Sequence, residues 1–250
     1  MKPVVIDLCC GRLGWSKAFI AEGWEAIGFD IEPMIGGGEI PDGCTVIRKS
    51  ILEINGYDLR AVSPALVVAS PPCQEFSYMA MPWKRGKQIA AALMEECPFP
   101  EGYDGSRTLA ELTALYRACF RIAREIGCPI VLENVKGAQP WVGRAQWHAG
   151  PYYLWGDVPA LMPHGRWQKG VGSGSLWFYQ NGGNDRSASS HSQERKEWTA
   201  QVAQIPEDLA RWIARCFKPT SCDLRQHRRF TSESPEVPLP EDGASMCRTP

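Results

Sequence analysis

Residues 4–14 read Val-Val-Ile-Asp-Leu-Cys-Cys-Gly-Arg-Leu-Gly, and this stretch decides the fold class. It opens with a short apolar, β-branched run, which is typical of a buried strand, and passes into a turn that contains Gly11 and Gly14. A helical pattern of apolar residues follows from Ser16 and stops at Gly23. A strand, a glycine-containing turn and a helix in this order predict the first unit of an α/β fold.

Three more buried-strand signals follow along the chain, at residues 26–29, 65–69 and 130–132. The clearest helix spans residues 108–127, where Thr108 and Glu111 form a capping box and Gly127 ends the pattern. Its apolar face, which includes Tyr116, predicts ordinary core packing. We therefore expect a mostly parallel α/β sheet with helices on both faces.

Changes in composition divide the chain into four predicted regions. Residues 1–155 form the expected main domain, and from 156 to 197 the hydrophobic period gives way to Gly, Ser, Asn and Arg, which predicts a small irregular insert. Residues 198–218 predict a helix that returns to the main domain, with Pro206 near its start. Residues 219–250 are rich in Pro, Ser and charge and predict a disordered tail.

Composition also narrows the class of protein. At 250 residues and 44% hydrophobic content, the chain can bury a substantial core. No apolar run approaches the roughly 20 residues of a membrane helix, so we expect a cytoplasmic protein without a membrane partner. The ten cysteines lack paired metal-ligand spacing, which favours reduced thiols and no metal site. The net charge of −1 means that any DNA-binding surface must be a local patch.

Two features near the first strand fit a nucleotide-like ligand. The turn with Gly11 and Gly14 would let the backbone approach a ligand at a helix N-terminus, although a tight turn alone explains the same glycines. Asp30, at the end of the second strand, is placed to accept hydrogen bonds from ribose hydroxyls. A helix-capping aspartate is the alternative for this residue.

The segment Ser70-Pro71-Pro72-Cys73-Gln74-Glu75-Phe76-Ser77 follows the strand at 65–69 directly. Its prolines stop the strand and present Cys73 at the carboxyl edge of the sheet, where α/β sites form. A cysteine in a core is usually inert packing, but Cys73 lies in a polar loop. The segment resembles the catalytic motif Pro-Cys-Gln-x-Phe-Ser of the DNA (cytosine-5)-methyltransferase family.

Other motifs follow in the order that this family uses. Residues 7–16 resemble its first cofactor motif, Asp30 its second, and Glu133-Asn134-Val135 its Glu-Asn-Val motif. The resemblance spans about residues 3–145, with a weaker return near 197–217, and the compact layout is similar to that of phage and prophage enzymes. It implies a Rossmann-like fold of the S-adenosylmethionine-dependent methyltransferase type. The cofactor-binding residues that it implies are Asp7, Leu8, Cys9, Gly11, Gly14, Asp30, Ile31, Ser50, Ile51 and Pro71.

The resemblance implies transfer of a methyl group from S-adenosylmethionine to C5 of cytosine in double-stranded DNA. Cytosine C5 is a poor nucleophile, so the Cys73 thiolate would first add at C6. Glu133 would contact N3 and the exocyclic amine and stabilise the adduct. Arg144 is the candidate for the arginine that contacts the base, which must leave the duplex stack to react.

Expected DNA contacts lie in the segment around Cys73, in the connection at 78–107 and in the insert at 156–197. A long connection at 78–107 is implied to close over the site as a lid, although its cations fit a solvated basic turn equally well. The insert is short, which predicts recognition of only a few base pairs. The implied DNA-binding residues are Gln74, Ser77, Lys84, Arg85, Lys87, Arg166 and Lys169.

The chain departs from the family pattern at several places. Cys9 stands where the family usually has Phe, and Leu13 replaces the first of two adjacent glycines. Ser50 stands where the family often has Asp, and Arg144 lies in a stretch without a clean Gln-x-Arg-x-Arg motif. These departures predict a reshaped cofactor pocket.

The sequence leaves three other functions to consider. Methylation of cytosine in RNA is the second enzymatic reading, but the Cys-Phe-Thr string of that branch is absent, which favours DNA. A catalytically inactive DNA-binding relative would need neither Cys73 nor Glu133. A NAD-dependent oxidoreductase is disfavoured because the turn lacks Gly-x-Gly-x-x-Gly spacing. We expect no obligate protein partner.

Overall fold

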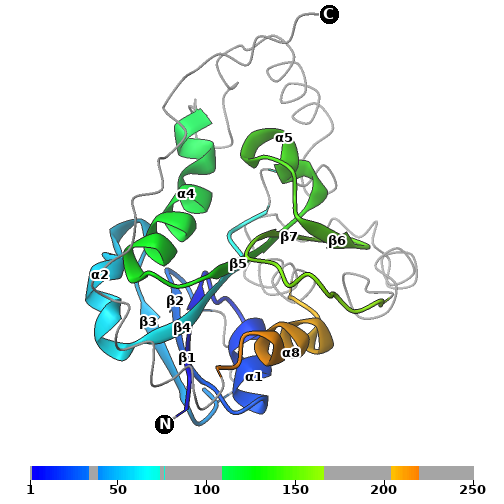
Figure 1. Cartoon of the computed structure of the whole chain (residues 1–250). Helices are drawn as coiled ribbons and strands as arrows, with labels where there is room; N and C mark the ends of the chain where they lie inside the picture. Colours follow the sequence, from blue (N-terminus) through cyan, green and yellow to red (C-terminus); the bar gives the residue numbers. More distant parts are fainter. Residues whose placement is uncertain (1, 34–38, 74–75, 77–108, 166–203, 220–250) are drawn as a thin grey trace, which may run out of the picture. The chain divides into compact units, whose positions relative to one another are not determined.

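A seven-stranded sheet in the order β3-β2-β1-β4-β5-β7-β6 organises the chain (Figure 1). Its strands are β1 (Val4–Leu8), β2 (Glu25–Asp30), β3 (Cys44–Arg48), β4 (Pro64–Ala69), β5 (Ile130–Asn134), β6 (Trp147–Ala149) and β7 (Tyr152–Gly156). The computed structural model describes residues 2–33, 39–73, 76, 109–165 and 204–219, within one unit that spans residues 1–218. The predicted lid at 78–107, the predicted tail and most of the predicted insert lie outside the described residues.

The sheet is parallel except at one edge. β1 pairs with β2 and β4 in parallel, and β3 and β5 extend the parallel arrangement on either side. β7 runs antiparallel to β5 and joins β6 in a hairpin. The predicted fold class is confirmed in its architecture: this is a Rossmann-like α/β fold with a mostly parallel sheet.

Helices cover both faces of the sheet, as the sequence predicts (Figure 1). The helices are α1 (Gly14–Ala21), η1 (Ile51–Glu53), α2 (Gly56–Leu59), η2 (Arg60–Val62), α4 (Leu109–Ile126), η3 (Lys136–Ala138), α5 (Gln139–Val142) and α8 (Glu207–Cys216). Side chains alternate along β1, so that Val5 packs towards α1 and α8 while Ile6 and Leu8 pack towards α4. The core therefore has two layers, one on each face of the sheet, and together they hold the strands in place.

Several predicted boundaries are confirmed and others are shifted. Gly127, with φ +85°, ends α4, and Pro206 immediately precedes α8. The first helix begins at Gly14, two residues before the predicted start, because Leu13 adopts the left-handed N-cap position. The sequence analysis missed β3, β6 and β7, which are short and lie at or beside the sheet edges.

The returning helix α8 docks on α1. Leu209 and Ile213 are fully buried in the core on that face of the sheet. Glu22, just after α1, accepts hydrogen bonds from Arg211 and Arg215, and these hydrogen bonds lower the pKa of Glu22 to about 2. The sequence thus correctly predicts a C-terminal helix that returns to the main domain.

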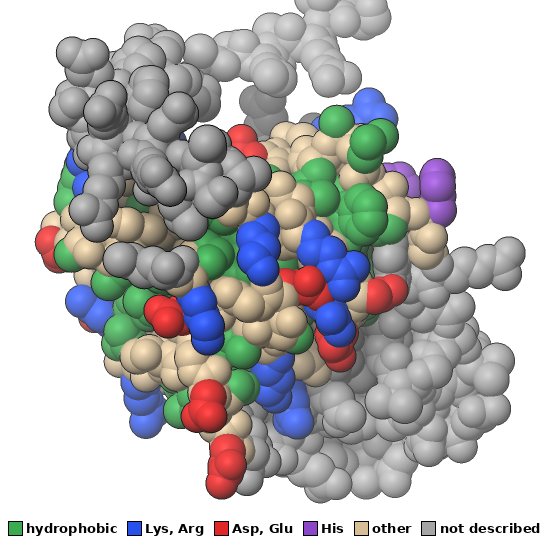
Figure 2. All heavy atoms as spheres, turned by 60° about the horizontal axis from the view of Figure 1, so that its bottom comes forward, with side chains coloured by type: hydrophobic (Ala, Val, Ile, Leu, Met, Phe, Trp, Pro, Cys, Tyr) green, Lys and Arg blue, Asp and Glu red, His purple; other side chains and the backbone are tan. Residues whose placement is uncertain are grey.

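The surface shows no segregation of charge on the face drawn in Figure 2, where described basic and acidic side chains lie close together. This agrees with a net charge near zero. Among the described helices, none combines the length and apolar character needed to cross a membrane.

Candidate active site

The carboxyl ends of four neighbouring parallel strands meet at one edge of the sheet. β2, β1, β4 and β5 are adjacent in that order, and each is followed by a segment that the sequence analysis singled out. They bring Asp30, the turn after β1, Cys73 and Glu133 to the same edge. In open α/β sheets ligands bind in the crevice at this edge.

The turn between β1 and α1 has an unusual backbone. Cys9, Gly11 and Leu13 adopt φ values of 58°, 46° and 63°, so two residues other than glycine occupy the left-handed region. A left-handed residue that carries a Cβ costs roughly 1–2 kcal/mol. Leu13 thus occupies a backbone conformation that usually favours glycine.

Asp30 fastens this turn. Its Oδ2 accepts a hydrogen bond from the Gly11 backbone N–H (2.9 Å), and its Oδ1 accepts one from the Glu32 backbone N–H (2.8 Å). A carboxylate oxygen has more than one acceptor site, so ribose hydroxyls can still donate to Asp30. These hydrogen bonds hold turns and cap no helix among the described residues, so the helix-capping alternative for Asp30 is wrong.

Asp7 lies under the turn and is fully buried. Its Oδ2 accepts hydrogen bonds from the backbone N–H (3.1 Å) and the hydroxyl (2.6 Å) of Ser16. Burial raises the pKa of Asp7 from 3.8 to about 7, against the lowering effect of these hydrogen bonds. Asp7 therefore joins β1 to α1 through Ser16 and has no exposed surface that could contact a ligand.

Two apolar side chains stand exposed beside Asp30. Ile31 follows β2 and is 65% exposed, and Leu52 in η1 is 53% exposed. Ser50 caps η1 by accepting from the Leu52 backbone N–H, whereas Ile51 is buried in the core. The exposed apolar residue of this turn is thus Leu52, which the sequence analysis did not select.

Gly14 is required by packing within the chain. A Cβ atom added at Gly14 would lie 2.8 Å from Cγ of Gln204, in the segment that leads into α8. The glycine therefore lets the returning segment approach the start of α1. Leu8, another predicted cofactor residue, is fully buried in the core.

The segment that carries Cys73 is held by its neighbours on both sides. Trp15 in α1 donates its indole N–H to the Ser70 hydroxyl (2.9 Å). Asn134, buried at the end of β5, donates its side-chain amide to the Pro71 carbonyl (2.8 Å). The Glu-Asn-Val motif thus fixes the position of the Pro-Pro-Cys motif across the β4–β5 boundary.

Cys73 shares partial exposure with Cys9 and Cys128, whereas Cys10 and Cys119 are buried. Burial raises the pKa of Cys119 and of Cys128 to about 12, and also raises the pKa values of Cys9 and Cys10. Cys73 is partly exposed and follows an exposed proline. Within the described residues, no group of three or more His, Cys, Asp or Glu side chains could hold a metal ion.

Glu133 is buried at the end of β5, with 3% of its surface exposed. Its charge contributes to raising the pKa values of two tyrosines, Tyr116 on α4 and Tyr152 on β7, for which burial is the larger cause.

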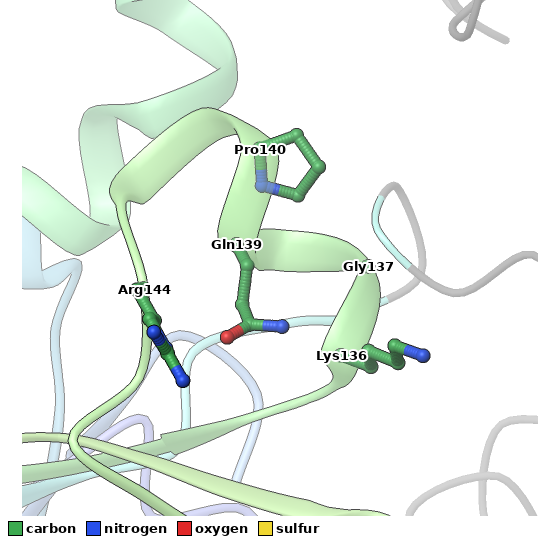
Figure 3. Close-up of a pocket in the computed structure, with 5 residues that line it drawn as sticks. All are labelled: Lys136, Gly137, Gln139, Pro140 and Arg144. Carbon is green, nitrogen blue, oxygen red and sulfur yellow. The ribbon is translucent and has the colours of Figure 1, made fainter.

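A cavity of about 610 Å³ opens just beyond β5. It is lined by Lys136, Gly137, Gln139, Pro140 and Arg144, which come from η3, α5 and the turn before β6 (Figure 3). The Gln139 side-chain carbonyl accepts a hydrogen bond from the Ala145 backbone N–H, which shapes the wall beside Arg144. The sequence analysis selected Arg144 but missed Lys136, which follows Val135 directly.

The remaining predicted DNA-binding residues lie outside the described part of the chain. These residues are Gln74, Ser77, Lys84, Arg85, Lys87, Arg166 and Lys169.

Comparison with known proteins gives only distant likenesses. No protein-family model matches the chain, and no curated protein matches it in sequence. The Dnmt2 methyltransferase of S. pombe is 16% identical with a TM-score of 0.34, and the match covers 56% of this chain and 36% of that chain. The methyltransferase EhMeth of Entamoeba histolytica is 17% identical with a TM-score of 0.34, over 56% of this chain and 40% of that one. The matched region thus spans less than half the length of these two proteins, and similarity at this level carries no information about activity.

Proposed function

We propose that this protein transfers a methyl group from S-adenosylmethionine to C5 of cytosine in double-stranded DNA. The observation that carries the proposal is the pairing of Cys73 and Glu133 at the carboxyl ends of adjacent strands, with Asn134 hydrogen-bonded to Pro71 between them. A nucleophile and a buried acid at one edge of the sheet are what addition to a pyrimidine ring requires.

The residues around the first turn fit the proposed cofactor. The turn at residues 9–13 includes the partly exposed Gly11, which has no side chain, and the Asp30 carboxylate beside it can accept hydrogen bonds from ribose hydroxyls. The exposed side chains of Ile31 and Leu52 offer apolar surface for an adenine ring. When bound, S-adenosylmethionine supplies an electrophilic methyl group.

Cys73 and Glu133 then have separate tasks. The Cys73 thiolate adds to C6 of the flipped base, which makes C5 electron-rich. Glu133, which is buried, acts as the acid on the N3 side of the ring and so stabilises the adduct. After C5 has gained the methyl group, loss of the C5 proton restores the double bond and expels Cys73.

The cationic cavity supports a nucleic-acid substrate. Lys136 and Arg144 are exposed and line a cavity that begins two residues after the Glu-Asn motif. Lysine and arginine are the side chains that most often contact phosphate oxygens. We place the sugar-phosphate backbone beside the flipped base in this cavity.

The test is methyl transfer by the purified full chain from radiolabelled S-adenosylmethionine to duplex DNA and, separately, to RNA of the same sequence. Labelling of duplex DNA is expected, together with a covalent adduct on DNA that contains 5-fluorocytosine, because fluorine cannot leave as a proton. Labelling of RNA alone would overturn the proposed substrate.

Cys73→Ser should abolish both methyl transfer and the adduct while the protein remains folded. Cys216→Ser is the matched control, because Cys216 is an exposed thiol on α8, remote from the strand ends. Methyl transfer by Cys73→Ser at the wild-type rate would rule out the proposed nucleophile.

A further inference from the structure

Tyr116 occupies a position that ordinary core packing does not explain. It lies on α4 and is 3% exposed. Its ring makes edge-to-face contacts with Phe76 (5.7 Å between centroids) and with Trp155 (5.9 Å). Phe76 donates its backbone N–H to the Cys73 carbonyl (3.0 Å). Trp155 pairs with Leu132, the residue before Glu133.

These contacts place the Tyr116 ring between the segment that carries Cys73 and the strand that carries Glu133. The Tyr116 hydroxyl is buried and has no hydrogen-bond partner among the residues that the structure describes. A buried hydroxyl without a partner is destabilising, and phenylalanine would pack in the same space without that penalty. The hydroxyl therefore points to an acceptor among the ionisable groups close to it.

The surrounding groups limit what that partner is. Burial raises the pKa of Tyr116 far above its ordinary value, and the charges of Glu133, Cys119 and Cys73 raise it further. Tyr116 thus remains protonated and serves as a donor. Cys119 is fully buried and its pKa is raised to about 12, so it stays a neutral thiol near neutral pH. Cys73 and Glu133 remain as the candidate acceptors.

We propose that the Tyr116 hydroxyl donates a hydrogen bond to the Cys73 thiolate and thereby favours the ionised form of this thiol. This inference rests on the proposed role of Cys73 as nucleophile. Donation to the Glu133 carboxylate would work against the chemistry, because it would favour loss of the proton that Glu133 holds at the base. Donation to the thiolate supports the chemistry, since the thiolate is the attacking species.

The experiment measures the pH dependence of alkylation of Cys73 by iodoacetamide, read peptide by peptide by mass spectrometry. Tyr116→Phe keeps the ring contacts and removes only the donor. In this variant we expect the midpoint for Cys73 to move up by about one pH unit, the effect of losing one hydrogen bond to a charged group. The midpoint for Cys216, an exposed thiol of the same molecule, should not move.

Tyr152→Phe is the matched control. Tyr152 is another buried tyrosine whose pKa is raised by Glu133, but it lies on the opposite face of the sheet and its hydroxyl donates to the Gln204 carbonyl. Its removal should leave the Cys73 midpoint unchanged. Circular dichroism and thermal unfolding check that both variants fold.

Two results would overturn the inference. An unchanged Cys73 midpoint in folded Tyr116→Phe would exclude the hydrogen bond. A shift that disappears when Tyr116→Phe is combined with Glu133→Gln would show that Tyr116 acts on Cys73 only through Glu133. Alkylation needs neither cofactor nor nucleic acid, so either result is separable from a failure of the methyl-transfer assay.

Discussion

Two carboxyl groups close to the turn after β1 meet different surroundings. Asp7 is fully buried with Ser16 as its hydrogen-bond partner, and its pKa is raised to about 7. Asp30 lies at the strand end, where two backbone N–H groups donate to it. Burial works against the charge of Asp7, whereas Asp30 is placed to hold the turn and a ligand together.

The raised pKa of Asp7 predicts a pH-dependent stability difference. Between about pH 4 and pH 7 the unfolded chain loses the Asp7 proton while the folded chain keeps it, so folding stability is lost as pH rises through this range. Asp7→Asn cannot ionise but can still accept from Ser16. Relative to this variant, the wild type should lose on the order of 3–4 kcal/mol of unfolding free energy between about pH 4 and pH 8. Urea unfolding of both proteins at the two pH values measures the difference, and parallel pH profiles would disprove it.

Asp30 should contribute directly to cofactor affinity. Asp30→Ala removes both the proposed ribose acceptor and the tether to Gly11, and should weaken binding of S-adenosylmethionine by about 1–3 kcal/mol. Asp30→Asn keeps an acceptor for the Gly11 N–H and serves as the control for turn geometry. Isothermal calorimetry on both variants gives the affinities. An unchanged affinity in Asp30→Ala would remove Asp30 from the cofactor site.

At the scale of elements, residue Gln204 and helix α8 pack against α1, the first helix. Gln204 lies where any side chain at position 14 would stand, and α8 covers the face of the sheet next to α1. Glu22 joins the two helices through Arg211 and Arg215, across nearly 190 residues of sequence. Docking of α8 therefore supports the helix that follows the candidate cofactor turn.

Glu22→Gln should weaken this docking in a pH-dependent way. Hydrogen bonds from Arg215 and Arg211 hold the pKa of Glu22 near 2, below its ordinary value of 4.5. Its contribution to stability is full above about pH 4.5 and is lost as pH falls towards 2. The variant should melt at a lower temperature than the wild type at pH 7, with a difference that shrinks as the pH is lowered to 3. A pH-independent difference would indicate lost packing instead of lost charge. Glu207→Gln, an exposed neighbour that contacts only Arg211 at 3.5 Å, is the control.

At the scale of the whole molecule, the sequence predicted the fold where hydrophobic burial is complete. β1, β4 and β5 are buried on both faces and were recognised as apolar runs. β3 was missed because it is an edge strand whose residues are half exposed. The β6–β7 hairpin was missed because β6 has only three residues and no turn signal was recognised between the strands.

The candidate site follows the same division. Cys73, Glu133 and Asp30 could be predicted as site residues because each lies at or shortly after the end of a recognisable strand. Tyr116 and Leu52 were missed because a helical apolar pattern does not distinguish a core tyrosine from one beside a site, and because η1 is a single turn in which Ile51 points inward and Leu52 outward. Such distinctions depend on the packing of distant segments, which periodicity does not record.

The final prediction concerns how the whole protein would hold DNA when its net charge is close to zero. Binding must then depend on a few local cations, and the cavity beyond β5 presents Lys136 and Arg144 together. Each phosphate contact releases about one counterion, so log K falls with log salt by about 0.9 per contact. Lys136→Ala and Arg144→Ala combined should reduce the salt slope of duplex DNA binding by about 1–2 and weaken binding at low salt. Arg60→Ala removes a cation in η2, just before β4 and so at the opposite edge of the sheet, and should leave the slope unchanged. Fluorescence anisotropy over a series of salt concentrations gives the slopes. Equal slopes for the wild type and the double variant would show that Lys136 and Arg144 do not contact DNA phosphates, and that other cations of the chain make these contacts.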